Sequence, residues 1–313
     1  MTVMIRDLRP ADPADVESVV RVRRTALPYL LSTPEGIAFE LAGANPAKRY
    51  RVLVAETGDG RIVGTAQVGI AYESPEPGRS FVNAYVDPAA RGLGAGSALL
   101  AHAEEYLAGE GAVEVYAWVL DEPANRAFAE RRGYRAGRSA HFLRLDLAGA
   151  ALPDIPALPA GVELRPASAF TADPRPLFEA DAETTADEPG DVGAEFDDYE
   201  DWVRHTWNNP DLDKELTVVA LVDGAVAAFT AALTDGGTRY GSGMTGTLRN
   251  FRGRGLAKLV KTASLHRARA AGYREAFTGN DTGNEPMLAV NTWFGYEICA
   301  TEVRYTKKLK EQP

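Results

Sequence analysis

Cysteine, histidine and long apolar runs are all scarce in this chain of 313 residues. It has one cysteine, Cys299, and four histidines with no metal-ligand spacing. The sequence therefore excludes an intramolecular disulfide and a cysteine-rich metal site, and we expect no bound metal. No apolar run reaches the roughly 18 residues of a membrane-spanning helix. Because Arg6, Asp7 and Arg9 stand near the start, a secretory signal is disfavoured, and we expect a cytoplasmic protein without a membrane partner.

Basic residues are also outnumbered, with 34 Lys and Arg against 44 Asp and Glu and a net charge of −10. A protein that binds nucleic acid gains most of its affinity from cationic side chains on phosphates. We therefore expect no nucleic-acid partner. The negative charge suits a small cationic ligand, and it also serves solubility alone.

The length exceeds what one hydrophobic core usually supports, and predicts two domains. Residues 149–160 contain three prolines and little charge, which is typical of a linker. We place an N-terminal domain at residues 1–148 and a C-terminal domain at 161–313. Residues 162–166 repeat the pattern of residues 5–10, as expected if the second domain restarts the first.

A glycine-rich turn occurs twice, first at residues 91–96 after the apolar run 81–86, and again at residues 252–257 after residues 245–248. Each copy leads into a helical pattern. Glycines let a backbone approach a ligand closely, and the first amides of a helix have no partner inside it. One such turn alone fits a structural role equally well. Since Gly133-Tyr134 and Gly295-Tyr296 follow the two copies at similar distances, the sequence predicts a duplicated anion site.

The patterns between these motifs predict a mixed α/β sheet flanked by helices in each half. Apolar runs at 81–86 and 113–119 are separated by a helix, so we expect them to be parallel neighbours. Turn residues 58–60 and 223–224 predict hairpins. We expect residues 133–147 to form the closing strands of the first half.

Both glycine turns fit the pattern Arg/Gln-x-x-Gly-x-Gly/Ala, and the sequence here resembles the GNAT superfamily of acetyl-coenzyme A-dependent N-acyltransferases, with two domains in tandem over nearly the whole chain. The resemblance implies two acyl-CoA N-acyltransferase folds and acetyl-CoA as the cofactor, with its pyrophosphate on the turn amides. In the first half it implies cofactor binding by Tyr85, Val86, Arg91, Gly92, Leu93, Gly94, Ala95, Gly96 and Ser97. In the second half the corresponding residues are Thr247, Leu248, Arg252, Gly253, Arg254, Gly255, Leu256, Ala257, Lys258 and Asn284.

The same resemblance separates the two halves in chemistry. The last helix of the family usually carries an Asn that touches coenzyme A and, seven residues on, a Tyr that protonates its sulfur. The first half has Glu122 and Ala129 at these places, whereas the second has Asn284 and Asn291. An amide donates a hydrogen bond but releases no proton near neutral pH. We therefore expect the second half to be catalytic, with Asn291 orienting the reactants or lying on the helix surface, and the first half to bind coenzyme A structurally or to be degenerate.

The general base is not evident, because neither strand before the turns carries a carboxylate. Residues 178–202 contain many Asp and Glu residues and no Lys, Arg or His. This composition fits either a solvated segment or the mouth of an acceptor site. Asp187 and Glu188, acting through water, are the candidates there, with Asp235 as an alternative. Lys258, Lys261 and Arg267 fit either contacts to a ribose phosphate or a solvated helix face.

We therefore expect an N-acetyltransferase that moves an acetyl group to the primary amine of a small cationic acceptor by direct attack in a ternary complex, as a monomer or homodimer. Two alternatives remain. Residues 278–291 resemble a branch of the superfamily that includes mycothiol synthase, which implies acetylation of a cysteinyl amine on a sugar-inositol scaffold. The missing Tyr in both halves also fits a coenzyme A-binding protein without turnover.

Overall fold

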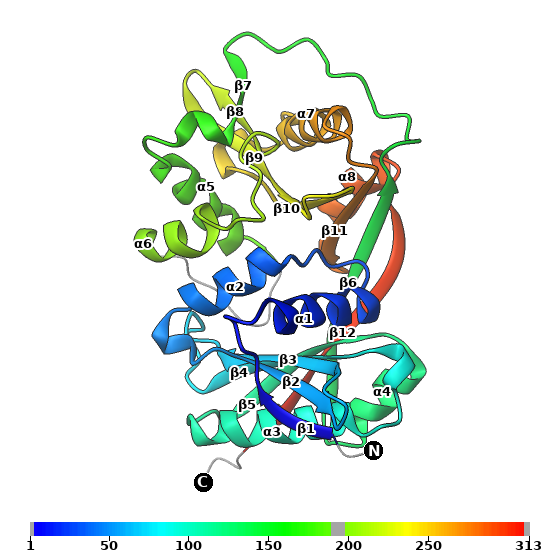
Figure 1. Ribbon diagram of the computed structural model, residues 1–313. Coiled ribbons are helices and arrows are strands. Elements are labelled where there is room, and N and C mark those ends of the chain that lie inside the picture. Colours follow the sequence, from blue (N-terminus) through cyan, green and yellow to red (C-terminus); the bar gives the residue numbers. More distant parts are fainter. Residues whose placement is uncertain (1–2, 189–197, 310–313) are drawn as a thin grey trace. The chain divides into compact units, whose positions relative to one another are not determined.

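The computed structural model describes residues 3–188 and 198–309, which belong to two units. Unit 1 comprises Met1–Ala140 and Ala300–Pro313, and unit 2 comprises His141–Cys299. Figure 1 traces both units along the chain. Among the described residues, no helix has the length and apolar character needed to cross a membrane.

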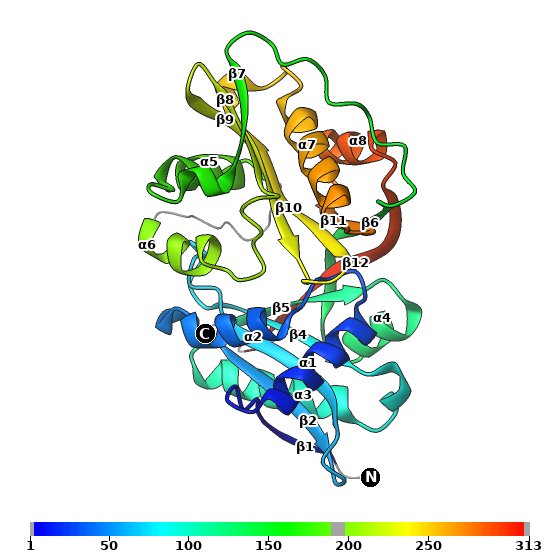
Figure 2. The same ribbon diagram turned by 45° about the horizontal axis from the view of Figure 1, so that its top comes forward.

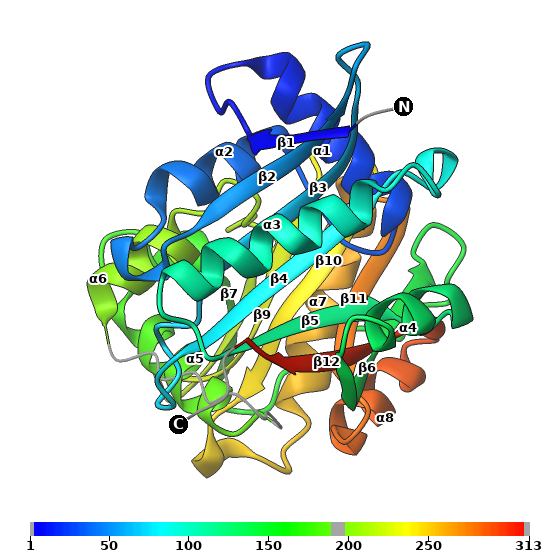
Figure 3. The same cartoon turned by 90° about the horizontal axis from the view of Figure 1, so that it is seen from below.

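Unit 1 is built on a mixed sheet with the strand order β1-β2-β3-β4-β5-β12. Helices α1 and α2 cover one face of it, and α3 runs across the other (Figures 1 and 3). As predicted, β4 and β5 are parallel, and β3 pairs antiparallel with β2 and β4. The bounds are β1 Val3–Asp7, α1 Pro13–Ala26, α2 Pro34–Gly43, β2 Arg51–Thr57, β3 Ile62–Ile70, β4 Arg79–Val86, α3 Ala95–Gly109, β5 Glu114–Leu120, α4 Pro123–Glu130 and β12 Glu297–Lys308.

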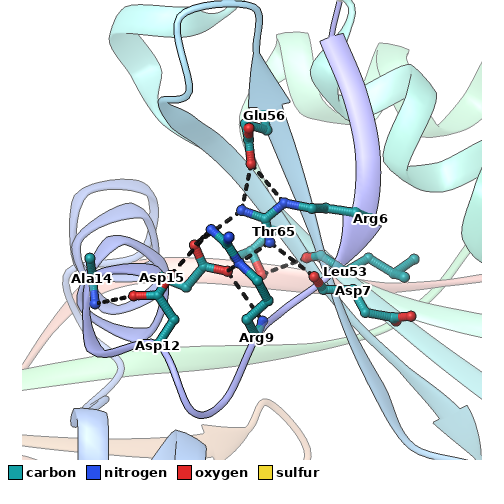
Figure 4. A network of polar contacts seen from close by, with 9 residues as sticks. All are labelled: Arg6, Asp7, Arg9, Asp12, Ala14, Asp15, Leu53, Glu56 and Thr65. Carbon is teal, nitrogen blue, oxygen red and sulfur yellow. Dashed lines mark hydrogen bonds and ion pairs between the residues drawn. The ribbon is translucent and has the colours of Figure 1, made fainter.

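A buried carboxylate ties α1 to the first strand of unit 1 (Figure 4). Asp15, in the first turn of α1, is only 4% exposed and accepts hydrogen bonds from Arg6 at 2.7 Å and Arg9 at 2.6 Å. The two guanidinium groups hold the pKa of Asp15 well below its usual range. Asp12 caps the helix by accepting from the amide of Ala14. The start of α1 is therefore fixed on β1.

Unit 2 repeats the plan with the strand order β6-β11-β10-β9-β8-β7. Helix α7 lies against one face, and α5 and α6 lie against the other (Figure 2). In the acidic segment, Asp181 on α5 is buried and accepts a hydrogen bond from Trp202. Asp191, Glu195 and Asp197 lie outside the described residues. The bounds are β6 Arg135–Asp146, β7 Val162–Pro166, α5 Arg175–Ala186, α6 Tyr199–Trp202, β8 Val218–Val222, β9 Ala225–Thr234, β10 Arg239–Thr247, α7 Leu256–Ala270, β11 Glu275–Asp281 and α8 Glu285–Trp293.

The last strand of each sequence repeat divides between the units. Residues 133–147 contain one long strand, β6, rather than the several closing strands expected, and its residues from His141 onward belong to unit 2. There Leu143 and Leu145 pack with Tyr240 and Phe294. In return β12, at the end of the chain, pairs with β5 and buries Tyr305 in the core of unit 1. Each unit therefore contains parts of both β6 and β12, and so residues of both sequence repeats. The repeat pattern alone does not reveal this division.

This exchange makes a prediction about where a mutation acts. Tyr305 is 1% exposed, so Tyr305→Ala should lower the free energy of unfolding by about 3–5 kcal/mol. Amide hydrogen exchange should become faster in β4 and β5 of unit 1. As the matched control, Leu143→Ala should speed exchange in β10 and β11 of unit 2. Faster exchange confined to unit 2 in the Tyr305 variant would contradict the assignment of β12.

Candidate functional site

In both units the two parallel strands separate along their length. The pairing of β4 with β5 ends at Phe81 and Tyr116, although β4 continues to Val86 and β5 to Leu120. The pairing of β10 with β11 likewise ends at Gly241. Past these points the backbone ladder stops, and the side chains of Asn83 and Thr278 supply the bonds that still join the strands: Asn83 accepts from the amide of Trp118, and Thr278 donates to the carbonyl of Ser242. Each unit therefore opens a wedge in its sheet whose walls carry backbone groups able to bind a ligand.

The glycine turns stand where the wedges open, directly before α3 and α7. Gly94 and Gly255 are the N-cap residues of these helices and adopt left-handed φ angles of 87° and 76°. Glycine takes this conformation without a steric penalty. No side chain caps either helix, in contrast to Asp12 on α1 or Thr33 on α2. The first amides of both helices are thus available to an anion, as the sequence predicted.

In unit 2 the turn borders a cavity of about 570 Å³. Of the residues predicted to bind the cofactor in the second half, eight line this cavity: Thr247, Arg252, Gly253, Gly255, Leu256, Ala257, Lys258 and Asn284. Leu248 and Arg254 are not among the lining residues. The cavity is also bordered by Asp187 and Glu188 at the end of α5, whereas Asp235 accepts hydrogen bonds from Gly237 and Arg239 in its own turn.

Polar groups on the cavity wall fit a phosphate-bearing ligand. The hydroxyl oxygen of Thr247 is buried and has no hydrogen-bond partner within the described part of the chain. Such a group destabilises the protein unless a ligand or water satisfies it. Together with the uncapped amides of α7, this orphaned hydroxyl shows that the residues present suit the pyrophosphate-containing cofactor that the sequence implied.

Asp187 is engaged with two arginines of the turn. Its carboxylate accepts from Arg249 at 2.7 Å and from Arg252 at 2.5 Å. These hydrogen bonds lower the pKa of Asp187 to about 2. A carboxylate held ionised in this way is a poor proton acceptor at neutral pH. The geometry favours a role for Asp187 in positioning Arg252.

Strand β10 carries a bulge at the cavity that β4 lacks. Gly243 and Met244 both lie opposite Ala231 on β9, because the register shifts between Ser242 and Thr245. The β3–β4 register in unit 1 runs without such a shift. A bulge leaves one residue outside the ladder and redirects neighbouring groups. Gly243 and Met244 line the cavity, so the bulge forms part of its wall in unit 2.

A buried polar network joins α7, α8 and β11 beside this cavity. Lys261 is 1% exposed and donates a hydrogen bond to Asn291 at 2.6 Å, and Asn291 in turn donates to Asn280. Lys261 and Asn280 line the cavity, while Asn291 lies behind them and is completely buried. Burial without a carboxylate partner among the described residues lowers the pKa of Lys261 to about 7. A group that titrates near neutrality on a cavity wall is a candidate for proton transfer.

Burial excludes one of the two alternatives for each of these residues. Lys261 is not part of a solvated helix face, and Asn291 does not lie on the helix surface. Arg267 donates to the carbonyl of Glu215. The signal that could have singled out Lys261 is its place in the repeat: it is the sixth residue of α7, and the sixth residue of α3 is the buried Leu100. A lysine at a core position destabilises the fold unless its amino group is paired and hydrogen-bonded. Its occurrence there is therefore unusual.

Unit 1 has a second cavity of about 510 Å³ at its own turn. The predicted first-half residues that line it are Tyr85, Val86, Arg91, Gly92, Gly94, Ala95, Gly96 and Ser97. Leu93 is 39% exposed and does not contribute. Ala129, at the place of the family Tyr, also lines the wall. Glu122 is the N-cap residue of α4, but its carboxylate accepts from the side chain of Asn125 instead of from a helix amide. Sequence reasoning missed Glu302, which reaches this cavity from β12.

Comparison with known proteins agrees with this architecture. The model of the acetyltransferase (GNAT) family matches residues 17–134 and again residues 178–296. A mycothiol acetyltransferase of Rhodococcus jostii is 28% identical over 94% of both chains, and one of Clavibacter michiganensis is 30% identical over 82% of this chain and 80% of its own. A tandem GNAT protein from the clavulanic acid biosynthesis pathway shares the fold over 100% of both chains, with a TM-score of 0.74 and 23% identity.

These matches confirm the fold class, two tandem GNAT folds with mixed sheets. They also confirm the prediction of an acyltransferase. Both copies of the glycine turn fall within the two matched regions. The chain belongs to the GNAT family of acetyltransferases.

Proposed function

We propose that unit 2 transfers the acetyl group of acetyl-CoA to the primary amine of a small cationic acceptor, by direct attack while both are bound. One observation carries the proposal. A single cavity joins the uncapped start of α7, which suits a pyrophosphate, to the buried amino group of Lys261, which suits proton transfer.

The cofactor would be held by residues already on the cavity wall. The amides that follow Gly255 and the hydroxyl of Thr247 would meet the pyrophosphate, with Arg252 and Lys258 supplying positive charge. The exposed edge of β10 past Gly241 would bind the extended arm that carries the thioester. When bound, acetyl-CoA supplies an acetyl group activated by its thiol leaving group, whose reference pKa is about 8.5.

Lys261 compensates for the missing Tyr in this proposal. Its amino group lies 2.6 Å from the side-chain oxygen of Asn291, which occupies the Tyr place in the sequence. A longer side chain at position 291 would extend into the same region. Because the pKa of Lys261 is about 7, a large share of its amino groups carry a proton at neutral pH. Lys261 would donate that proton as the thiol departs, and Asn291 would hold the amino group in place.

The acceptor would enter beside Glu188 at the end of α5. Glu188 is exposed on the cavity rim, next to the ion-paired Asp187. An alkylammonium with a pKa near 10 must lose a proton before it attacks. Glu188 would accept that proton through water, while the negative charge of this rim favours a cationic ligand.

The similarity to mycothiol acetyltransferases favours a second candidate acceptor. In that case the amine would belong to a cysteinyl group on a sugar-inositol scaffold. The proposed roles of Asn291 and Lys261 do not depend on which acceptor is bound. Lys261 would therefore be the proton donor with either candidate acceptor. Incubation with acetyl-CoA and either polyamines and amino sugars or the cysteinyl pseudodisaccharide distinguishes them by thiol release.

The role of Lys261 predicts a specific change in pH dependence. Since the protonated form acts, the rate of the parent enzyme should fall as pH rises through about 7. Lys261→Met should lower kcat at pH 7 on the order of 100-fold, at the low end for general acid catalysis because a thiolate leaves readily. The descending limb near pH 7 should also disappear. Lys261→Arg keeps the charge but releases no proton near neutral pH, so it should not restore the rate.

A stability measurement provides a control that needs no acceptor. The folded pKa of Lys261 lies below its unfolded value of 10.5, so the unfolded chain binds more protons between these two values. The free energy of unfolding should therefore rise with pH from about 7 toward 10 by more in the parent than in Lys261→Met. Identical pH profiles of stability and rate in the two proteins would refute the assignment.

The anion site of unit 2 is tested by an isosteric pair at Gly255. Asp and Asn both tolerate a left-handed φ, and a Cβ at this position meets no atom within 4 Å. Gly255→Asp places a carboxylate where the pyrophosphate would bind and should raise the KM for acetyl-CoA about tenfold or more. Gly255→Asn should raise it much less. Equal KM values for both variants and the parent would show that the reaction does not use this turn.

A further inference from the structure

The cavity of unit 1 is lined by two chemically different groups of residues. One group is the turn of Gly92 and Gly94 with the uncapped amides of α3. The other group comprises Tyr85 on β4, Trp118 on β5 and Glu302 on β12. Glu302 pairs with Leu120 at the carboxyl end of β5, past the point where the pairing of β4 with β5 stops. One continuous space therefore connects an anion site to a carboxylate.

The environment of the Glu302 carboxylate suggests that it binds a ligand and does not stabilise the fold. Glu302 is half-buried, and among the described residues its carboxylate interacts with the charge of Arg138 without a hydrogen bond or close ion pair. Burial raises the pKa of Glu302 to about 7, and the charge of Arg138 opposes that rise only in part. A carboxyl that is desolvated without a protein partner destabilises the fold. Its presence on a cavity wall points to a function there.

We propose that unit 1 contains a second acyl-acceptor site, in which Glu302 receives the ammonium group of an acceptor and takes up its proton. This inference rests on the proposed use of acetyl-CoA, but assigns a second reaction centre to the other unit. An ammonium ion is the common ligand group that complements a lone carboxylate. The acyl donor would bind at the turn of Gly94, and the amine would bind beside Glu302, since both residues line the same cavity.

The proposed step balances with the groups named. A proton passes from the ammonium to Glu302 and then to solvent. The amine nitrogen forms a bond to the acetyl carbon while the carbon–sulfur bond breaks, and the second nitrogen-bound proton ends on the departing thiolate through water. No side-chain acid assists, because Ala129 and Leu100 stand where unit 2 has Asn291 and Lys261. Unit 1 should therefore be slower than unit 2, not inactive.

The charged and titratable groups around Glu302 set the expected pH dependence. Arg138 on β6 lowers its pKa, and Tyr85 on β4 interacts with it electrostatically. Arg23 and Glu40, from α1 and α2, act on Tyr85 with opposite signs. Arg304 lies two residues further along β12, on the same strand face, and stacks on Tyr116 at 3.7 Å. A base must be deprotonated, so the reaction in unit 1 should speed up as pH rises through about 7 and then level off.

The experiment separates the two units by variants. Lys261→Met combined with Gly255→Asp suppresses unit 2, and thiol release is then measured with acetyl-CoA and spermidine, glucosamine or cysteine. We expect residual release that falls at least tenfold when Glu302→Gln is added, and equally when Gly94→Asp is added. Glu105→Gln, an exposed carboxylate on α3, serves as the matched control and should leave the residual release unchanged.

A readout without turnover accompanies it. The carboxyl carbon-13 signal of Glu302, assigned by its loss in Glu302→Gln, should titrate near pH 7 in the free protein. Spermidine should move this midpoint downward, because a bound ammonium favours the carboxylate. Titration near the ordinary value of 4.5 would overturn the proposal.

The outcomes distinguish the two proposals. Activity of the parent with none in the unit 2 double variant, or residual activity that Glu302→Gln leaves unchanged, contradicts the second site and leaves the function of unit 2 intact. The unit 2 double variant could also keep full activity and lose it when Glu302→Gln is added. That result contradicts the function of unit 2 and supports the second site. No thiol release by any of these proteins contradicts both.

Discussion

The separation of two parallel strands is the constraint on which both cavities depend. A backbone ladder joins β4 to β5 and β10 to β11 over only the first part of each pair. Beyond that point the strand edges need other partners, because buried backbone groups left without hydrogen bonds destabilise a protein. A glycine turn follows β4 and another follows β10, and each leads into a helix, α3 or α7, whose first amides have no side-chain cap. These amides lie at the same opening between the strands. A ligand with an anionic group and an extended arm satisfies both sets of groups at once.

The two units use this common frame in different ways. Unit 2 adds a bulge on β10 and a buried lysine on α7, held by Asn291 and Asn280. Unit 1 has a regular strand and an apolar residue at the corresponding helix position, and its carboxylate comes from β12. In both units burial brings one ionisable group to titrate near neutral pH, a cation in one and an acid in the other. Desolvation, rather than a neighbouring charge, is the main cause in each case.

Ion pairs at the rim serve a different purpose from these buried groups. Asp187 bridges Arg249 and Arg252, and Asp15 bridges Arg6 and Arg9. Their arginine partners lower the pKa of both carboxylates below the ordinary value, further from neutral pH. Such pairs fix the positions of a turn and of a helix, but they do not exchange protons near pH 7. The contrast explains why an acidic residue near a cavity is not, by that fact, a base.

The sequence by itself determined the duplicated glycine turn, the parallel strands around it and the family, because these depend on local backbone chemistry and on spacing along the chain. It also placed Asn291 on the last helix of the second half and Asn284 at the start of that helix. Only the tertiary structure decided that Lys261 is buried against Asn291 and that Glu302 joins the cavity of unit 1. The physical reason is that desolvation and strand exchange bring together residues far apart in sequence. Whether a lysine is a solvated cation or a neutral-range acid depends on what surrounds it, which periodicity alone does not encode.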